Sequence, residues 1–376
     1  MKTSRRPYAL LSLIPLLLFL ASTATASASL GFQGATGSVF TMTNSTSGNA
    51  VEAYSRSATG QLTYAGSFST GGFGLAGLTG SNQGGLTLSQ DGSWLFVVNA
   101  GSNTLSVFRV NQFPSISLTL TDVVSSDGVT PISVTVFGNW VYVLNQGSDS
   151  AASNIAGFTL TSFGTLIPIR GSIQPLSEAL PSPAQISFNP TGNVLIVTEK
   201  GTNTIDGYSV NFLGQASGPV LNPSSGDAPY GFAFDNRGQL IVSDAASDAL
   251  SSYSVSPSGS VNVISGSISN GGQAAPCWVA VTPTLAFTTD AHVGNISSYA
   301  ISPSGRLTLL QSVAASTGWS TKPDLDMAIS QNSQFLYVYV AGGNEIQGYL
   351  IHSNGVLSLI QTVSGLTAGG DGLAAN

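Results

Sequence analysis

Charged residues are scarce in this chain, so the few that cluster are candidates for chemistry. Only 7% of the 376 residues are Asp, Glu, Lys or Arg. Glu199 and Lys200 stand together after an apolar run, and Asp290 is followed two residues later by His292. A carboxylate can remove a proton from water, and a nearby Lys or His can stabilise the oxyanion that forms on an attacked carbonyl. The candidate catalytic residues for such a hydrolysis are Glu199, Asp290, Lys200 and His292.

Other kinds of chemistry have less support. Asp290 and His292 could share a metal ion, but two ligands without a third nearby make a weak metal motif. The sequence has no zinc spacing, no serine nucleophile motif and no phosphate-binding glycine loop. We therefore expect neither a metal nor a cofactor. The net charge of −7 also disfavours nucleic acid as a partner, because nucleic-acid-binding proteins need a basic surface.

The elements that must position these residues belong to a repeated unit. AQISFNPTGNVLIVTEKGTNTIDGYSV (184–210) aligns with GLTLSQDGSWLFVVNAGSNTLSVFRV from Gly85 and with GFAFDNRGQLIVSDAASDALSSYSV from Gly231. Five units open on a proline, at spacings of 52, 46, 47 and 47 residues: Pro131, Pro183, Pro229, Pro276 and Pro323. A glycine marks the last turn of each of these units: Gly164, Gly214, Gly259, Gly305 and Gly355. Counting the related stretches gives seven units.

Each unit holds four short apolar runs, rich in Val, Ile, Phe and Tyr and separated by turn residues. Four strands at a period of about 40–50 residues are typical of a propeller blade. The sequence therefore predicts an all-β fold, a seven-bladed β-propeller of four-stranded blades over residues 29–376. The first unit lacks an innermost strand, and residues 371–376 resemble the start of one, so we expect the C-terminal strand to complete blade one. A two-domain sandwich is the alternative, but it would not require so regular a period.

Two polar positions recur when the units are aligned. The first closes the second strand and holds Asn44, Asn99, Asn145, Glu199, Asp244 and Asp290. Because the acidic members come from consecutive units, we expect an acidic arc at the rim, with Asp244 binding substrate; the alternative is a set of solvated loops. The second position recurs in all seven units, which indicates turn chemistry: Asn49, Asn103, Asn154, Asn203, Asp248, Asn295 and Asn344.

The innermost strands start at the same rim and supply further substrate-binding candidates. These are Gln185, Tyr230, Trp278 and Asp326. Aromatic rings beside carboxylates would suit a sugar-like or cyclic ligand. For Tyr230 and Trp278 the alternative is packing between blades, because aromatic side chains dominate protein cores.

The first residues resemble a targeting segment. Lys2, Arg5 and Arg6 precede an apolar run over residues 8–20, and Ala24-Thr25-Ala26 fits a small-x-small cleavage site. We expect residues 1–28 to be a signal peptide and the mature protein to be exported, periplasmic or extracellular, monomeric and without a membrane span. A retained membrane anchor is the alternative. Cys277 is the only cysteine, so no disulfide supports the fold, and we expect it to be a small buried apolar residue.

SFNPTGNVLIVTEKGTNTIDGYSV, YGFAFDNRGQLIVSDA and ISSYAISPSGRLTLL resemble blades of the seven-bladed lactonase family, which includes 6-phosphogluconolactonase-like and carboxymuconate cyclase-like enzymes. The resemblance covers nearly the whole mature chain. It implies a hydrolase of carbohydrate metabolism that acts on a lactone at the mouth of the central channel.

The arginines depart from this family pattern. By the repeat register, Arg237 and Arg306 lie in turns on the opposite face, and Arg56, Arg109 and Arg170 lie at outer strand ends. An anionic lactone would require cationic groups at the mouth, so we expect a neutral or weakly charged one. The alternative is a non-catalytic, YVTN-like propeller that serves as an extracellular binding or cell-surface scaffold (compare Leu95-Phe96-Val97-Val98-Asn99).

Overall fold

A computed structural model describes residues 1–2, 4, 36–76, 83–112, 115–319 and 324–376. The chain divides into two units, Met1–Gln33 and Gly34–Asn376, and the strands belong to the second. The expected signal peptide lies almost entirely outside the described residues. In the part of the chain that is described, no helix has the length and apolarity needed to cross a bilayer.

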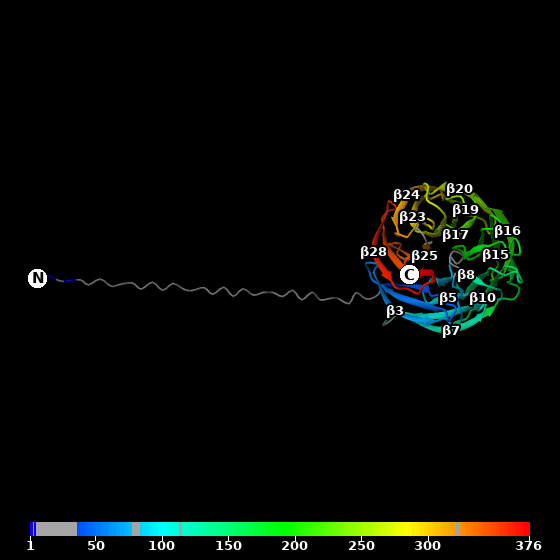
Figure 1. The fold of residues 1–376 in the computed structure, drawn as a ribbon, viewed down its shortest axis with the longest axis horizontal. Helices are drawn as coiled ribbons and strands as arrows, with labels where there is room; N and C mark the ends of the chain where they lie inside the picture. Colours follow the sequence, from blue (N-terminus) through cyan, green and yellow to red (C-terminus); the bar gives the residue numbers. More distant parts are fainter. Residues whose placement is uncertain (3, 5–35, 77–82, 113–114, 320–323) are drawn as a thin grey trace. The chain divides into compact units, whose positions relative to one another are not determined.

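Within the described residues, twenty-nine strands form seven antiparallel sheets that follow one another around a ring (Figure 1). Blade one contains β29 (Asp371–Ala375), β1 (Gly37–Met42), β2 (Ala50–Arg56) and β3 (Leu62–Ser69), from the inside outward. Blade two contains β4 (Leu86–Leu88), β5 (Trp94–Asn99), β6 (Thr104–Asn111) and β7 (Ser117–Ser125). Blade three contains β8 (Pro131–Phe137), β9 (Trp140–Asn145) and β10 (Asn154–Leu160), with β11 (Leu166–Pro168) and β12 (Gln174–Pro175) outermost.

The remaining four blades are regular. Blade four contains β13 (Pro183–Phe188), β14 (Val194–Glu199), β15 (Thr204–Val210) and β16 (Ala216–Pro223). Blade five contains β17 (Pro229–Phe234), β18 (Gln239–Asp244), β19 (Ala249–Val255) and β20 (Val261–Ser269). Blade six contains β21 (Pro276–Val281), β22 (Leu285–Asp290), β23 (Asn295–Ile301) and β24 (Leu307–Ser316). Blade seven contains β25 (Asp324–Ile329), β26 (Phe335–Val340), β27 (Glu345–Ile351) and β28 (Leu357–Ser364).

The predicted seven-bladed propeller is therefore confirmed, as is the closure of blade one by the C-terminus. β29 pairs with β1, which joins Val39 to Ala375 and Thr41 to Leu373. Blade three is the exception to four continuous strands, because its outer strand is interrupted between β11 and β12. Both pieces end in proline, Pro168 and Pro175, which has no backbone N–H to donate and is tolerated at a sheet edge.

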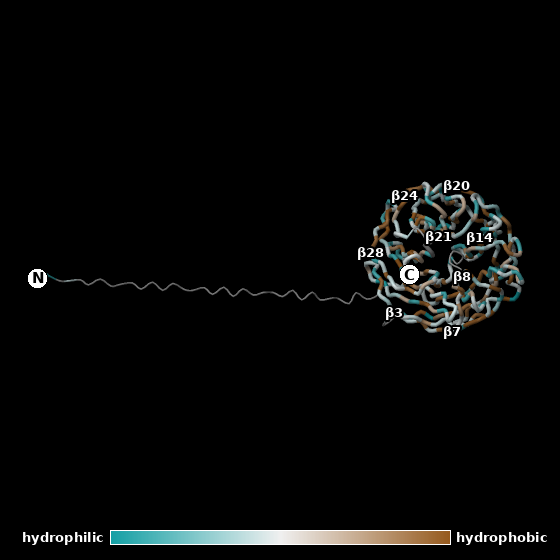
Figure 2. Tube along the Cα trace, viewed as in Figure 1, coloured by the Kyte–Doolittle hydropathy of each residue, from teal (hydrophilic) through white to brown (hydrophobic). Residues whose placement is uncertain are grey.

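The core lies between neighbouring blades. Phe40 and Met42 of blade one pack in one cluster with Leu95 and Val97 of blade two. Apolar stretches recur around the whole ring in Figure 2, as expected when each sheet is covered on both faces by other sheets. Burial of these faces, without any disulfide, holds the blades together.

The glycines that close each unit have the conformation that the turn requires. All five lie at φ between 80° and 88°, where side chains with a Cβ are disfavoured. The Gly214 turn also contacts a neighbouring blade: a Cβ at this position would lie 2.6 Å from the Trp140 ring. These glycines therefore serve both the turn and the packing between blades.

Candidate active site

A hollow of about 480 Å³ lies between the innermost strands, and its walls come from β4, β13, β17, β21, β25 and β29. Most of the lining is apolar and includes Phe188, Phe234 and Val279. The side chains of Gln83, Gln185 and Asp326 add amide and carboxyl groups. This central channel therefore contains two of the residues that the sequence analysis assigned to substrate binding, Gln185 and Asp326.

Asp326 is a buried carboxyl group held by backbone amides of three blades. Its Oδ2 accepts hydrogen bonds from Gly84 N (3.1 Å) and Leu373 N (3.2 Å), and its Oδ1 accepts one from Met327 N (2.8 Å). Burial raises the pKa of Asp326 to about 7, although the three N–H groups oppose that shift. The group therefore titrates near neutral pH at the wall of the channel, as a proton-transfer group requires.

Two glutamine side chains link different blades at the channel. Gln185 bonds the neighbouring blade, and Gln83 bonds a blade on the other side of the ring. Gln185 Oε1 accepts a hydrogen bond from Phe232 N of the next blade (2.6 Å). Gln83, from blade two, donates through Nε2 to Val279 O of blade six (3.2 Å). Its side chain occupies the space beside Gly231, where a Cβ would lie 1.5 Å from Gln83 Oε1. That oxygen is buried against Gly231 and has no hydrogen-bond partner among the described residues.

Lys200 lies where β14 ends, over the start of β17. Its Nζ is 4.6 Å from the centroid of the Tyr230 ring, a cation–π distance. Burial lowers the pKa of Lys200 to about 8, and the nearby Cys277 opposes that shift. Within the described residues the ammonium forms no salt bridge, since the single pair found there joins Arg237 to Asp235. Lys200 is thus a half-buried cation without an acidic partner.

Tyr230 and Trp278 pack against each other at the same end of the channel. Their ring centroids are 5.4 Å apart with an interplanar angle of 56°, and both side chains are buried. Cys277 lies beside them and is buried as expected, and burial raises the pKa of its thiol to about 12. Tyr230 and Trp278 therefore pack between blades, which was the alternative to substrate binding. A role in substrate binding stays a prediction.

Glu199, Asp244 and Asp290 all close second strands, at the ends of β14, β18 and β22, yet none of them is exposed. Each accepts a hydrogen bond from the segment that enters its blade: Glu199 Oε1 from Ser177 N (3.0 Å), Asp244 Oδ1 from Ser224 Oγ (3.3 Å) and Asp290 Oδ1 from Asn270 Nδ2 (2.9 Å).

These contacts anchor each blade to the connection from the preceding one. Each of the three carboxylates bonds its own connecting segment. Five hollows among the described residues have walls made by other side chains. A catalytic role for Glu199 or Asp290, and substrate binding by Asp244, stay predictions.

Among the described residues, no basic group lines the channel hollow. His292 is exposed in the loop after β22, and His352 is exposed in the turn after β27, where its Nε2 is 2.8 Å from Ser358 Oγ. Arg237 bonds Asp235 in the turn between β17 and β18. Arg56, at the end of β2, is buried and bonds the backbone oxygen of Asn376. Among the described residues, no arginine lines the channel.

The second polar position acts in turns, as predicted. Asn103, Asn203, Asp248 and Asn344 have positive φ values, between 46° and 56°. Asn203 Oδ1 accepts a hydrogen bond from Ala228 N (2.7 Å), and Asp248 Oδ1 accepts one from Ala275 N (2.9 Å). Each therefore supports its own turn and the connection to the next blade.

Asp206 is a buried acid that the sequence analysis missed. It lies on β15 next to Glu199, and Ser177 N donates to both carboxyl groups, at 3.0 Å to Glu199 Oε1 and 3.1 Å to Asp206 Oδ2. Burial, followed by the hydrogen bond to Glu199 and its charge, raises the pKa of Asp206 to about 8. The repeat register could have revealed it. Asp206 aligns with Ser106, Ser251 and Ser297 on the third strand, so this unit has a carboxyl group where those three units have a hydroxyl group.

Replacing Asp206 with Asn should stabilise the protein at alkaline pH. The pKa of Asp206 is raised on folding. The contribution of this group to the free energy of unfolding is therefore most favourable below about pH 4, and it is lost as the pH rises towards 8. Asparagine cannot ionise, and we expect the melting temperature at pH 9 to rise by about 5 °C or more, with little change at pH 5. Thermal unfolding across pH 5–9 measures this. Asp149→Asn, in an exposed loop, is the control, and parallel pH profiles for wild type and Asp206→Asn would contradict the assignment.

Comparisons with known proteins give information on both the family and the fold. Residues 46–156 match the family described as lactonase, 7-bladed beta-propeller. No curated protein sequence matches the chain.

Three solved structures are similar over the propeller. A periplasmic gluconolactonase from Pseudomonas aeruginosa has a TM-score of 0.70 at 14% identity, covering 90% of this chain and 99% of that one. A protein from Bacteroides fragilis, assigned provisionally as a 6-phosphogluconolactonase, has a TM-score of 0.64 at 17% identity, covering 90% and 98%. Its counterpart from Bacteroides uniformis, with the same provisional assignment, has a TM-score of 0.69 at 17% identity, covering 90% and 99%.

At these identities the structural likeness shows the fold alone. The family match supports the resemblance for residues 46–156, and the architecture confirms the predicted fold. Residues 46–156 carry the sequence pattern of the seven-bladed β-propeller lactonases, and the propeller as a whole has the fold of that family.

Proposed function

We propose that this protein is an exported enzyme that hydrolyses a neutral or weakly charged, sugar-like lactone at the Lys200 end of the channel. The observation that carries the proposal is the half-buried Lys200 ammonium, which has no acidic partner among the described residues and lies over Tyr230, at the start of a strand that lines the channel. The match to the lactonase family supports it. The neighbour from Pseudomonas aeruginosa, a periplasmic gluconolactonase, supports both the neutral substrate and the export.

The hydrolysis needs one base, one acid and one cationic group. Asp326, as the carboxylate, removes a proton from water while the water oxygen bonds to the lactone carbonyl carbon. Lys200 stabilises the negative charge that develops on the carbonyl oxygen. The ring C–O bond then breaks, and the proton held by Asp326 passes to the leaving alkoxide. The product is the open-chain hydroxy acid.

Asp326 retains the capacity for this role despite its hydrogen bonds. A carboxylate oxygen has two acceptor sites, and Oδ1 uses one of them for Met327 N. The second acceptor site of Oδ1 is left for a water proton. The side chains of Gln83 and Gln185 add neutral amide groups to the lining. Such a lining favours a neutral sugar lactone over a phosphorylated one, because no arginine lines the described channel.

Lys200→Met should lower kcat/KM on the best lactone by about 100-fold, the size of effect expected for losing one oxyanion-stabilising group. The measurement is lactone-ring opening, followed by proton release, for glucono-, galactono- and ribonolactones and for 6-phosphogluconolactone. We expect the neutral lactones to be the better substrates. His352→Gln, in an exposed outer turn, is the matched control and should retain wild-type activity.

Two outcomes would reject the assignment. Absence of hydrolysis with every lactone would reject the activity, and full activity in Lys200→Met would reject the role of this lysine. The same assay tests the roles predicted from the sequence for Glu199, Asp290 and His292. A 100-fold loss in Glu199→Gln or Asp290→Asn, with the melting temperature unchanged, would move the general base to that carboxylate.

The proposed export has its own test. The basic start, the apolar run over residues 8–20 and the small residues around Ala26 support it. Mass spectrometry of the protein expressed with its full leader should find a mature N-terminus within residues 25–30. A chain that keeps Met1 and fractionates with the cytosol would contradict export.

A non-catalytic binding propeller is the second candidate. The observation that favours it is Gln83, whose side chain crosses from blade two to Val279 of blade six and narrows the channel. The lactone assay separates the two candidates, because a binding protein would show saturable ligand binding without ring opening.

A further inference from the structure

Two hollows adjoin each other on the face of the propeller opposite Lys200. Lys200 follows the end of a second strand, whereas these hollows are formed by the turns that precede the second strands, including Gln90-Asp91-Gly92 before β5. Their volumes are about 410 Å³ and 630 Å³, and they share Gln90, Asp91 and Gln331. Hollows of this size are typical of small-molecule sites.

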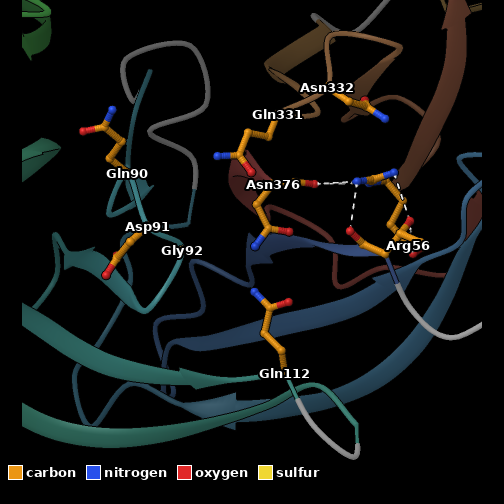
Figure 3. A pocket seen from close by; sticks show the side chains of 9 residues that line it. Arg56, Gln90, Asp91, Gly92, Gln112, Gln331, Asn332 and Asn376 are labelled. Carbon is orange, nitrogen blue, oxygen red and sulfur yellow. Dashed lines mark hydrogen bonds between the residues drawn. The ribbon is translucent and has the colours of Figure 1, made fainter.

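The first hollow is lined mainly by amide side chains (Figure 3). Gln112 and Gln331 extend towards Asn376, whereas Gln90 and Asp91 lie on the opposite side with their side chains directed away from Asn376 in this view. Among the described residues, the amides of Gln90, Gln112 and Gln331 make no hydrogen bond, and all three side chains are exposed. A primary amide presents donors and an acceptor in one plane, so it can pair with two adjacent hydroxyl groups.

Two further polar groups are held in place by the fold. Asn376 Oδ1 accepts hydrogen bonds from Ser38 N (2.6 Å) and Ser38 Oγ (3.0 Å), which fixes the amide and leaves Nδ2 as a donor. Asp91 accepts from Ser89 Oγ (2.6 Å) and Ser93 Oγ (2.7 Å). The Ser89 bond, followed by the Ser93 bond, lowers the pKa of Asp91, so its carboxylate is an ionised acceptor. A fixed donor and a fixed acceptor reduce the entropy lost when a ligand binds.

The charge of the hollow disfavours an anionic ligand. Arg56 lines it, but its Nε and Nη2 bond Asn376 O at 3.2 Å and 3.0 Å, and its Nη1 lies 3.4 Å from Thr36 Oγ1. The guanidinium is therefore occupied by the protein, and Asp91 contributes a negative charge. Trp94 lines the second hollow and is partly exposed, and Arg109 lies 5.2 Å from its ring centroid. The C–H groups of a sugar ring can pack on the part of the Trp94 ring that the protein leaves uncovered.

We propose that these two hollows form a binding site for a neutral oligosaccharide, with the first hollow holding one end through amide–hydroxyl pairs and the second packing a further ring on Trp94. The site shares no lining residue with the channel hollow and does not depend on lactone hydrolysis. The propeller could therefore bind a glycan at these hollows whether or not a lactone is hydrolysed at the Lys200 end of the channel.

Titration calorimetry of the full chain with maltotetraose, cellotetraose, xylotetraose and chitotetraose tests this site. At least one should bind saturably. Gln331→Leu removes a free amide shared by both hollows, and Asp91→Asn removes the ionised acceptor while keeping an oxygen for Ser93 N. Each should weaken binding by about fivefold to tenfold, as expected for the loss of one or two hydrogen bonds.

Asn236→Leu is the matched control, because Asn236 is an exposed polar residue in the corresponding turn of blade five, outside both hollows. It should leave binding unchanged, as should Lys200→Met. Melting temperatures near wild type show that each variant is folded. Absence of binding to all four tetrasaccharides, or wild-type binding by both Gln331→Leu and Asp91→Asn, would overturn the proposal. Loss of binding in Lys200→Met would move the glycan to the channel mouth.

Discussion

A chain that ends at Gly370 is expected to lose its cooperative unfolding transition, or to melt more than about 10 °C below the full chain. The deletion removes β29 and leaves the inner edge of β1 unpaired. It also takes away Leu373 N, which donates to Asp326, and Asn376 O, which accepts from the buried Arg56. A buried charge that loses its partners is strongly destabilising.

Circular dichroism or scanning calorimetry measures this effect, and peptide rescue makes the test specific. A synthetic peptide of residues 366–376, added in excess, should pair with β1 and restore part of the transition, whereas the same residues in scrambled order should not. A truncated chain with the wild-type melting temperature would show that closure by β29 contributes little to stability.

Asp326→Asn should lower kcat/KM on the best lactone by roughly 100-fold or more, the range expected for loss of a general base. For the wild-type protein, activity should rise as the pH passes about 7, where Asp326 becomes ionised, and fall above about 8, where Lys200 loses its proton. The predicted profile is therefore a narrow bell with its maximum between these values. The rising limb should disappear in Asp326→Asn, and the falling limb should disappear in Lys200→Met.

A readout that does not depend on activity separates a structural role of Asp326 from a catalytic one. Carboxyl-carbon NMR should find several aspartates with raised pKa values, and the resonance that titrates near pH 7, between those of Asp244 and Asp206, should be missing from Asp326→Asn. If the wild-type protein shows that resonance but Asp326→Asn remains fully active and folded, the role of Asp326 is structural: it joins blades one, two and seven. A wild-type profile that is flat between pH 6 and 9 would contradict both proton-transfer roles.

Much of the fold could be predicted because its signals are local. The prolines that open β8, β13, β17 and β21 and the glycines that close the last turns act through their own backbone geometry, so their spacing reports the blade period directly. The closing strand was also predictable, since residues 371–376 have the pattern of an innermost strand and blade one lacked one. The interruption between β11 and β12 was not, because an edge strand has no partner on its outer side to constrain it.

The candidate site was only partly predictable, and Glu199 shows why. Its place at the end of β14 follows from the repeat, and Lys200 follows it in sequence, yet the two side chains have different surroundings. Glu199 is buried against Ser177 and Asp206, whereas Lys200 reaches over Tyr230. A repeat register gives the position of a residue along its strand, but it does not say whether the neighbouring blade covers that residue.

The sequence by itself determined the number of blades, the strand order, the closure by the C-terminus and the turn role of residues such as Asn203. Each of these depends on neighbours within one unit or on the count of units. Only the tertiary structure decided which polar groups face a hollow. Gln83 and Val279 meet across 196 residues, and Asp326 is held by Gly84, which lies 242 residues away in the chain. Such contacts arise when the ring closes, because the channel and its two faces exist only between blades.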